Sequence, residues 1–509
     1  MARPRYTRLQ RYRVSNDVLT LILEYLDPKS LFFASKAFKR IYAIVMEYHS
    51  LRYKFELAIS GMKDGAAPRA VAPLLGRLQL LLSYRTDWPR LNWTHEYKMQ
   101  VATPSHVGTS GGFLHQIRPH GAYVTVEITE LPSCRTGRSP ALTRRLRFTS
   151  SPIETIGIDS GQALIVAAHI FWQVQSGVVG VQLHFRDLWT FGKHPAAPAE
   201  LYEIPAQSLA PVSRAAVSIV GSKMALTLEF VGGQINHLLM DWRTFGARWI
   251  DDQDIYLLDE DLLLVLCKRG ASPPVLNLCR ITHIADMVVL RQYELPATWS
   301  TSPVTFCPNR APRPAPTALF YPDPATRVLV LASHPPGKRT SSASPRTWLF
   351  IHEGYFKRTP SRRDRLVVPW SHWGQHCAVK DLSRSSSSRT ALRGPYAVGA
   401  RVVFVESEPG ARSLAAAPAV SLHVIEFTPF PEGGAQPQLH PSWAAMGPRA
   451  MLFPSESARR LPAGTVEHYA VDDIGVTEDN VVLFLELQPG FRPVNILTFG
   501  APPTRAAHR

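Results

Sequence analysis

The sequence predicts a multidomain α+β chain, with a three-helix bundle and a helical extension at the N-terminus, followed by an all-β, propeller-like domain of about six to seven blades. Three observations lead to this prediction. Apolar residues recur at helical spacing over residues 14–60 and again over 74–88. From about residue 99 the pattern changes to short apolar runs separated by Gly, Pro, Asp and Ser, which is typical of strands and turns. These runs recur at intervals that fit repeated units.

Composition excludes several classes of protein. The chain has 509 residues, of which 45% are hydrophobic, so it has ample material for a core. Five cysteines are too few for a disulfide framework in a chain of this length. No apolar run approaches the roughly 18–20 residues of a membrane span, and the N-terminus lacks the apolar core of a signal peptide. We therefore expect a protein of the cytoplasm and/or nucleus, without membrane partners.

The net charge of +16 comes from 56 basic and 40 acidic residues. A basic chain is attracted to nucleic acid and to acidic partners. Here the basic residues are dispersed, and Arg, Ala and Pro are abundant together, as GC-rich coding favours. Nucleic-acid or chromatin association therefore remains an alternative and not the leading interpretation. One basic cluster consists of Lys357, Arg358, Arg362, Arg363 and Arg365. Together with the Arg/Ser run at 383–389, it is either a nuclear import signal or a solvated loop.

The helical part begins after a basic tail, residues 1–13, and its first helix is expected over residues 15–26. Asp27 and Pro28 end that helix, because a residue before proline avoids the α region. The same pair starts the second helix, since Asp caps helices and Pro fits the first turn. The apolar residues of the first helix fall on one face, at Val18, Leu19, Ile22, Leu23 and Leu26.

The second and third helices are also short, and the third is expected to extend towards residue 60. Together the three helices span about 35 residues, and domains this small rarely bury their apolar surface alone. We therefore expect the segment to dock on the rest of the chain or on a partner. Residues 61–98 are expected to form a linker, over 61–73, and one amphipathic helix, over 74–88.

The β-rich region, residues 99–500 before a short tail at 501–509, shows a loose repeat. A turn containing Asp or Gly precedes an apolar strand, and a second strand follows after a short connection. The seven turns are near Gly112, Asp159, Gly221, Asp261, Asp323, Gly399 and Asp479. The seven second strands are at 124–128, 178–185, 237–242, 275–281, 347–352, 421–427 and 494–499. Two of them run into similar turns, DLWTFG and DWRTFG, which favours propeller blades over a pair of irregular β-sandwiches.

Catalytic and metal-binding patterns are weak. Residues 108–112, GTSGG, fit G-x-S-x-G, but a probable strand follows where a nucleophile elbow needs a helix. His372, His376 and Cys377 have ligand-like spacing without the second pair that a structural zinc site needs. Phosphate-binding glycine motifs are absent from the sequence. We therefore expect a protein that is not an enzyme, with no catalytic, cofactor-binding or metal-binding residues.

Residues 14–45 resemble an F-box, and the match runs without a gap. Two positions depart from the family, because Ser15 replaces the usual Pro and Ile41 stands where Trp is common. Residues 51–65 and 77–94 are similar to the segment that follows the F-box in large fungal F-box families, and the stretches at 237–242 and 258–266 look like the β-repeat tails of those proteins. The matching F-box residues are Val14, Asp17, Val18, Leu19, Ile22, Leu23, Tyr25, Leu26, Asp27, Pro28, Leu31, Lys39 and Arg40.

The resemblance implies a substrate receptor of an SCF-type ubiquitin ligase. The F-box would dock the Skp-family adaptor, and through it a cullin, while the WD-like β domain would bind an unknown protein substrate. Two other hypotheses stay open: a non-catalytic scaffold with a degenerate F-box, and the basic nucleic-acid-associated protein. The residues expected on the adaptor face are Val14, Ser15, Val18, Leu19, Ile22, Leu23, Leu26, Pro28 and Leu31.

Overall fold

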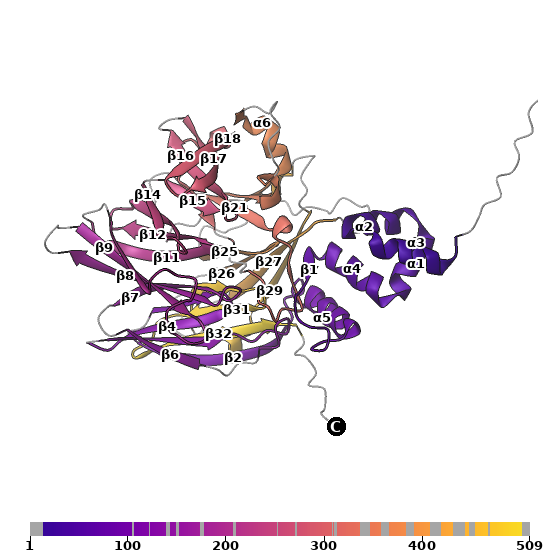
Figure 1. Cartoon of the computed structure of the whole chain (residues 1–509), viewed down its shortest axis with the longest axis horizontal. Helices are drawn as coiled ribbons and strands as arrows, with labels where there is room; N and C mark the ends of the chain where they lie inside the picture. The colour runs from indigo at the N-terminus through magenta and orange to yellow at the C-terminus, as the bar shows by residue number, and fades with distance from the viewer. Residues whose placement is uncertain are drawn as a thin grey trace, which may run out of the picture.

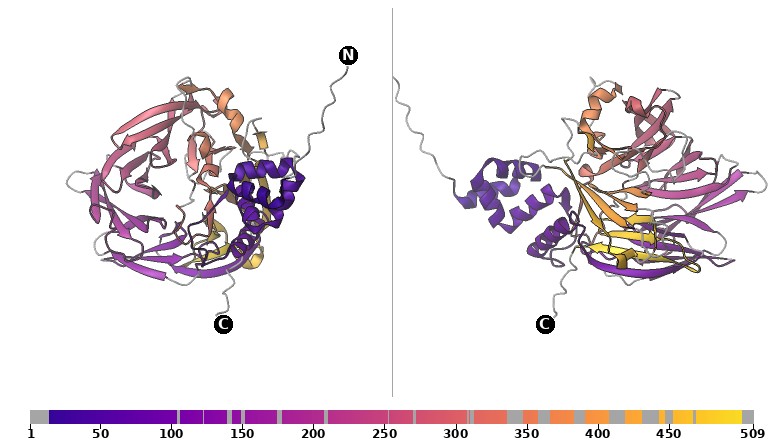
Figure 2. Two further views of the ribbon diagram at one scale, coloured as in Figure 1. Left: turned by 45° about the vertical axis from the view of Figure 1, so that its right-hand side comes forward. Right: turned by 180° about the vertical axis from the view of Figure 1, so that it is seen from behind.

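The computed structural model describes residues 14–500, except for 104–105, 122, 139–142, 149–151, 174–177, 207–209, 252, 270–271, 308, 310–312, 336–346, 358–365, 383–390, 408–418, 431–442, 447–452 and 467–468. The described residues form an N-terminal helical module and a seven-bladed β-propeller. The blades follow one another around a ring, and the helices lie at one end of it (Figures 1 and 2). A helical N-terminus followed by a propeller is the architecture that the sequence predicts.

The helical module has five helices, and their first residues explain where they start. Ser15 caps the first, because its Oγ accepts a hydrogen bond from the backbone N–H of Val18 at 3.4 Å. Asp27 caps the second by accepting from the N–H groups of Lys29 and Ser30, and Pro28 is its first residue, as expected. The helices are α1 (Asn16–Tyr25), α2 (Pro28–Ala37), α3 (Lys39–Glu47), α4 (His49–Ile59) and α5 (Leu74–Asp87).

The extended third helix that we expected is two helices in the structure. Tyr48 has φ −91° and ψ 117°, so it leaves the helical conformation between α3 and α4. The break turns α4 onto α2 and towards the propeller (Figure 1). Periodicity alone could not locate it, because apolar residues continue at helical spacing on both sides.

The propeller is a ring of antiparallel sheets whose first strands line the axis. Blade 1 has β3 (His106–Ser110), β4 (Phe113–Pro119), β5 (Val124–Glu130) and β6 (Thr143–Phe148). Blade 2 has β7 (Ile153–Asp159), β8 (Leu164–Gln173), β9 (Val178–Asp187) and β10 (Leu201–Pro205). Blade 3 has β11 (Val212–Val220), β12 (Lys223–Phe230), β13 (Ile235–Asp241) and β14 (Gly246–Asp251).

Blades 4 and 5 each have a fifth strand. In both cases this strand lies in the connection between the third and fourth strands of the following blade. Blade 4 has β15 (Asp254–Leu257), β16 (Leu262–Arg269), β17 (Ser272–His283), β18 (Asp286–Glu294) and the added β23 (Val367–Val368). Blade 5 has β19 (Val304–Cys307), β21 (Val328–Ser333), β22 (Thr347–His352), β24 (Ala378–Asp381) and the added β28 (Trp443–Met446). Blade 6 has β25 (Ala391–Val398), β26 (Arg401–Ser407), β27 (Val420–Thr428) and β29 (Phe453–Arg460).

Blade 7 closes the ring with strands from both ends of the chain. It combines β30 (Val471–Val476), β31 (Asn480–Leu485) and β32 (Phe491–Phe499) with β2 (Trp93–Ala102) as its outer strand. Tyr97 pairs with Ile496 at the centre of this contact. Closure of this kind hides the sheet edges that an open strand series would leave exposed. The first propeller strand therefore begins at Trp93, before the position near residue 99 that we expected, because this outer strand is largely exposed and has no apolar run.

The expected repeat matches the blades closely. All seven predicted turns lie between the first and second strands of a blade, and all seven predicted second strands are the third strands of the same blades. The two similar turns have the same geometry, with Phe191 and Phe245 at φ 60° and 61°. Asp187 and Asp241 each accept a hydrogen bond from the backbone N–H two residues later, at 2.9 and 3.0 Å.

The remaining elements connect the helices to the ring. Strand β1 (Met62–Asp64) pairs with β20 (Phe320–Pro322), which lies in the connection between β19 and β21. Residues 61–73, where we expected a linker, are thus held by the propeller, and Gly65 N–H also donates to the carbonyl of Leu319 at 2.9 Å. The short helices are α6 (Trp370–Trp373), α7 (Ala463–Val466) and the 3₁₀ turns η1 (Ala297–Trp299), η2 (Pro324–Thr326), η3 (Glu353–Tyr355) and η4 (Gly374–His376).

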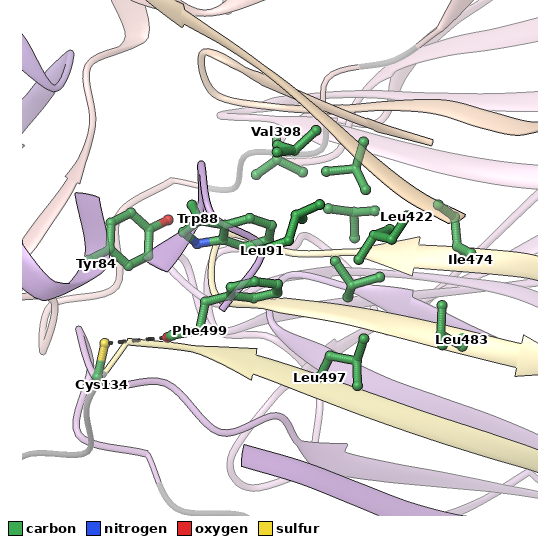
Figure 3. Packing of buried hydrophobic residues seen from close by; sticks show 14 of the residues in the cluster. Tyr84, Trp88, Leu91, Cys134, Val398, Leu422, Ile474, Leu483, Leu497 and Phe499 are labelled. Carbon is green, nitrogen blue, oxygen red and sulfur yellow. Dashed lines mark hydrogen bonds between the residues drawn. The ribbon is translucent and has the colours of Figure 1, made fainter. Parts of the chain in front are cut away.

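Helix α5 belongs to the same hydrophobic core as the last two blades. Tyr84, Trp88 and Leu91 are at most 1% exposed and pack against strands of blades 6 and 7 (Figure 3). Leu422 of blade 6 and Leu497 of blade 7 belong to this cluster. Such a shared core fixes the position of α5 on the propeller, because close-packed side chains leave little freedom to shift.

Candidate docking face on the N-terminal helices

Helix α1 has two apolar faces, and only one of them packs inside the module. Leu23 is 2% exposed, and Leu19 and Leu26 pack against the same core. The second face carries large apolar residues at i, i+3, i+4 and i+7 of the helix, which form one stripe and are 47–91% exposed, and Val14, just before the helix, is 43% exposed. We name this stripe the α1 outer face, and it consists of Val14, Val18, Leu21, Ile22 and Tyr25.

The structure divides the nine residues that we expected on the adaptor face into three groups. Leu19 and Leu26 are partly buried. Leu23 and Leu31 are 2% and 0% exposed, so they hold the helices together and do not belong to an exposed face. The inner face of α1 and the start of α2 thus fill the core of the module. The exposed residues are Val14, Ser15, Val18, Ile22 and Pro28.

Sequence reasoning missed other exposed apolar residues of the same module. Leu21 and Tyr25 complete the α1 outer face, and Tyr25 is 91% exposed. Phe33 of α2, Phe38 between α2 and α3, and Tyr42 of α3 are 54%, 61% and 46% exposed. The available signal was the breadth of the apolar pattern, because residues 18–26 contain more apolar positions than one core-facing stripe needs.

Polar contacts fix the ends of α1 relative to α3 and α4. Arg40 donates to the carbonyl of Val14 at 2.6 Å and to Asn16 Oδ1 at 2.8 Å, which ties α3 to the start of α1. Lys54 of α4 donates to the carbonyls of Glu24, at 3.0 Å, and Leu26 at the other end. The α1 outer face is therefore presented by a helix that is held at both ends.

The two departures from the F-box pattern have structural equivalents here. Ser15 occupies the N-cap of α1, where its side chain and backbone begin the helix. Ile41 is partly buried and packs against the module core from α3. Both substitutions therefore act on helix initiation and internal packing, and the exposed stripe of α1 is intact.

The helical module is fastened to the propeller at several points. The rings of Phe32 in α2 and Phe430, two residues beyond the end of β27, are stacked with centroids 4.4 Å apart. The Tyr53 hydroxyl donates to Asp64 at 2.9 Å, and burial raises the pKa of Tyr53 above its usual range. Arg77 of α5 forms an ion pair with Asp64 at 3.0 Å. These contacts lie on the side of the module that faces the propeller, whereas α1 lies at its far end (Figure 1).

A buried ionic network lies where α5 meets blades 6, 7 and 1. The Arg135 guanidinium contacts Asp479 at 2.8 Å, Glu478, and the carbonyl of Phe320 at 2.8 Å. The Tyr84 hydroxyl donates to the carbonyl of Glu478 and accepts from Arg401 at 3.1 Å. Burial raises the pKa of Tyr84 to about 12, so this hydroxyl stays protonated and can donate. The network links helix and propeller through groups that all have partners.

The weak catalytic and metal patterns have structural explanations. Ser110 lies at the end of β3 in a β-hairpin, where its Oγ accepts from the N–H of Ile158 at 2.9 Å. Cys377 is buried, which raises the pKa of its thiol, and its Sγ lies 3.8 Å from the carbonyl of Trp373. Within the described ranges there is no group of three or more His, Cys, Asp or Glu side chains that could hold a metal ion.

Two further expectations concern charge and membranes. Arg358, Arg362, Arg363, Arg365 and the run at 383–389 lie outside the described residues, whereas Lys357 is described and pairs with Glu353 at 3.5 Å. Among the helices of the described part of the chain, none is long and apolar enough to cross a membrane.

Comparison with known proteins shows similarity at the level of structure alone. No family model and no curated protein matches the sequence. The propeller domain of the Trilobed protease from Pyrococcus furiosus is 9% identical, with a TM-score of 0.40, over 80% of this chain and 99% of that one. The WD40 domain of SCAP from fission yeast is also 9% identical, with a TM-score of 0.38, over 81% of this chain and 100% of that one.

Proposed function

We propose that this protein is the substrate receptor of an SCF-type ubiquitin ligase, in which the helical module binds a Skp-family adaptor and the propeller binds the protein substrate. The observation that carries the proposal is the α1 outer face, an apolar stripe on the part of the module farthest from the propeller. Contiguous exposed apolar residues of this kind mark interaction sites. The ungapped F-box resemblance of residues 14–45 identifies the class of partner.

The role of the propeller in this proposal is binding and not catalysis. A closed ring of blades presents loops on a rigid frame, which suits recognition of another protein. The hairpin position of Ser110 supports a non-enzymatic role, since a nucleophile elbow needs a strand followed by a helix. In this proposal the cullin would be reached through the adaptor.

The test is adaptor binding by the full-length chain and by matched charge variants. Ile22→Asp places a carboxylate in the centre of the α1 outer face, where Ile22 is 50% exposed. Because a buried unpaired charge costs several kcal/mol, binding should fall by about a hundredfold or more. Val231→Asp, at a 61% exposed apolar residue of the propeller, is the matched control and should bind normally. Leu19→Asp is a poorer probe, because Leu19 packs on the module core and its loss also destabilises the fold.

Each outcome has a clear interpretation. Binding that Ile22→Asp abolishes and Val231→Asp preserves supports the receptor function. A folded wild-type chain that does not bind the adaptor would instead favour a scaffold with a degenerate F-box. Equal binding by wild type and Ile22→Asp would show that the α1 outer face is not the docking site.

A further inference from the structure

A central channel runs along the axis of the propeller, and the first strands of all seven blades line it. Its volume is about 1200 Å³. This is at or above the size of typical small-molecule pockets, roughly 300–1,000 Å³, so the channel can admit part of a polypeptide.

Two described residues of the connection between β19 and β21, Asn309 and Arg313, line one end of this channel. Asn309 donates to the carbonyls of Val328, at 3.1 Å, and of Gly399 in blade 6, at 2.7 Å. Arg313 pairs with Glu260 of blade 4. The Arg313 Cβ also lies 2.7 Å from the point that a Cβ on Gly161 of blade 2 would occupy. The connection includes β20, which pairs with β1, so Asn309 and Arg313 mark the end of the channel that faces the helical module.

The opposite end of the channel is its mouth, and blade 2 contributes aromatic residues there. Strand β8 runs away from the helical module, and its far end lies at the side of the propeller remote from the helices (Figure 1). Phe171 and Trp172 near that end both line the channel, together with Val179 and Pro211. Trp172 is 49% exposed, so its ring is available to a ligand.

Acidic residues outnumber arginines in the lining of the channel, whereas basic residues outnumber acidic ones in the whole chain. Six carboxylates and four arginines line the channel, although basic residues outnumber acidic ones by 56 to 40 in the sequence. The acidic residues are Glu154, Asp159, Glu229, Asp254, Asp472 and Asp473, and the arginines are Arg214, Arg313, Arg327 and Arg393. Several of these are already engaged: Arg313 with Glu260, Asp472 with Arg492, and Asp473 with the hydroxyl of Tyr396.

Glu154 differs from those residues because its carboxylate has no hydrogen-bond or ion-pair partner among the described residues. It lies on β7 in blade 2, the same blade as Phe171 and Trp172, and it lines the channel. Glu154 is exposed to solvent in the channel, and partial desolvation raises the pKa of its carboxyl. A carboxylate and an indole from one blade are the two groups that recognise a cationic side chain, the first by ion pairing and the second by cation–π attraction.

We propose that the channel mouth at blade 2 binds a lysine or arginine side chain of an extended polypeptide segment, with Glu154 and Trp172 as the recognising residues. The inference rests on the proposed function, for which it names a chemical feature of the substrate. His106 of blade 1 and Arg214 of blade 3 also line the channel, and burial together with Arg214 and Arg492 lowers the pKa of His106. The positive charge of Arg214 disfavours a cation at blade 3 and directs it to blade 2.

The test uses the full-length chain and acetylated, amidated heptapeptides with one central residue, Arg, Lys, Gln or Glu, between alanines and glycines. Calorimetric titration should show binding of the Arg and Lys peptides, with the Gln and Glu peptides at least about tenfold weaker, which corresponds to about 1.4 kcal/mol. Glu154→Gln and Trp172→Ala should each lower the affinity for the Arg peptide by about threefold to tenfold. Trp189→Ala is the matched control, because Trp189 also lies in blade 2 and is 47% exposed, but belongs to the turn after β9 at the other end of the blade.

Outcomes for this site and for adaptor binding can be separated. Ile22→Asp should leave peptide binding unchanged, and Glu154→Gln should leave adaptor binding unchanged, so failure of either proposal is visible alone. Preferential binding of the Glu peptide would overturn the inference and assign recognition to Arg214 and Arg393. Undetectable binding of every peptide at millimolar concentration, or binding that Glu154→Gln and Trp172→Ala do not weaken, would also overturn it.

Discussion

The indole of Trp88 lies almost parallel to the ring of Phe499, with centroids 3.8 Å apart and an interplanar angle of 14°. Trp88 ends α5, and Phe499 ends β32, the last strand of blade 7. The guanidinium of Arg401 covers the indole at 3.9 Å from its centroid. A residue of the helical module thus contributes to the core at the point where the ring closes, so the stability of module and propeller should be coupled.

Trp88→Ala should therefore destabilise the whole chain and not the helices alone. Removing a fully buried tryptophan typically costs about 3–5 kcal/mol, through lost burial and the cavity left behind. Unfolding in urea, followed by far-UV circular dichroism and by fluorescence, should show one transition shifted to lower denaturant. Trp189→Ala, at an exposed tryptophan, should shift it little. Two separate transitions in the wild type would contradict the coupling.

The network around Arg135 predicts a pH-dependent effect. Arg135→Met leaves Glu478 and Asp479 buried without their guanidinium partner, which should cost about 3–5 kcal/mol near neutral pH. Burial already raises the pKa of Glu478, and loss of Arg135 raises it further. A folded-state pKa above the unfolded one favours the protonated native state, so the variant gains stability as pH falls. The free energy of unfolding of the variant, measured in urea, should therefore lie closer to that of wild type at pH 5 than at pH 7.

Local chemistry explains why much of this fold could be predicted from sequence. Asp27 and Pro28 specify a helix start by themselves, and the structure has α2 beginning there. The blade turns could also be predicted, because Gly221 and Gly399 adopt φ near +61°, a conformation that favours glycine, and apolar strands follow. Such signals are local, so they survive without knowledge of tertiary contacts.

The parts that could not be predicted depend on contacts between distant residues. Leu23 and Ile22 are neighbours of similar hydrophobicity, yet one is 2% and the other 50% exposed. Only the packing of α2, α3 and α4 decides which faces inwards. In the same way, Trp189 and Trp242 both follow an aspartate near a Thr-Phe-Gly turn, but Trp242 is buried and Trp189 is exposed. The structural equivalent of Trp242 is Leu188, because the two tryptophans differ by one position in the turn.

Three histidines, of which His237 is buried and the other two are partly buried, predict loss of stability in mild acid. Burial lowers the pKa of His184, His237 and His423 to about 4 in the folded chain. Since histidine in an unfolded chain titrates near 6.5, the unfolded state binds these protons first. The stability that the neutral histidines contribute is present above pH 6.5 and is lost as pH falls towards 4. The free energy of unfolding should decrease by about 2 kcal/mol per histidine between pH 7 and pH 5, roughly 5 kcal/mol for the three together.

His237→Gln should flatten that pH dependence, because it removes one of the three groups. His237 is 1% exposed, and its Nδ1 lies 2.9 Å from the Thr227 hydroxyl, a contact that glutamine can replace in part. His49→Gln, at an exposed histidine of α4, is the control and should leave the slope of unfolding free energy against pH unchanged. An equal slope for wild type and His237→Gln would show that this histidine does not contribute to acid sensitivity.

Phe430 offers a separate test of how firmly the helices are oriented on the propeller. Its ring stacks on Phe32 at 4.4 Å and meets Phe33 edge to face at 5.9 Å, both in α2. Phe430→Ala should destabilise the chain by only about 1 kcal/mol, because aromatic pairs of this kind contribute about 0.5–1.5 kcal/mol beyond their burial. Adaptor affinity should be unchanged, since the α1 outer face is not touched. The distance distribution between spin labels on Lys39 and Arg248 should nevertheless broaden, and an unchanged distribution would show that α5 and the β1–β20 pair alone hold the module in place.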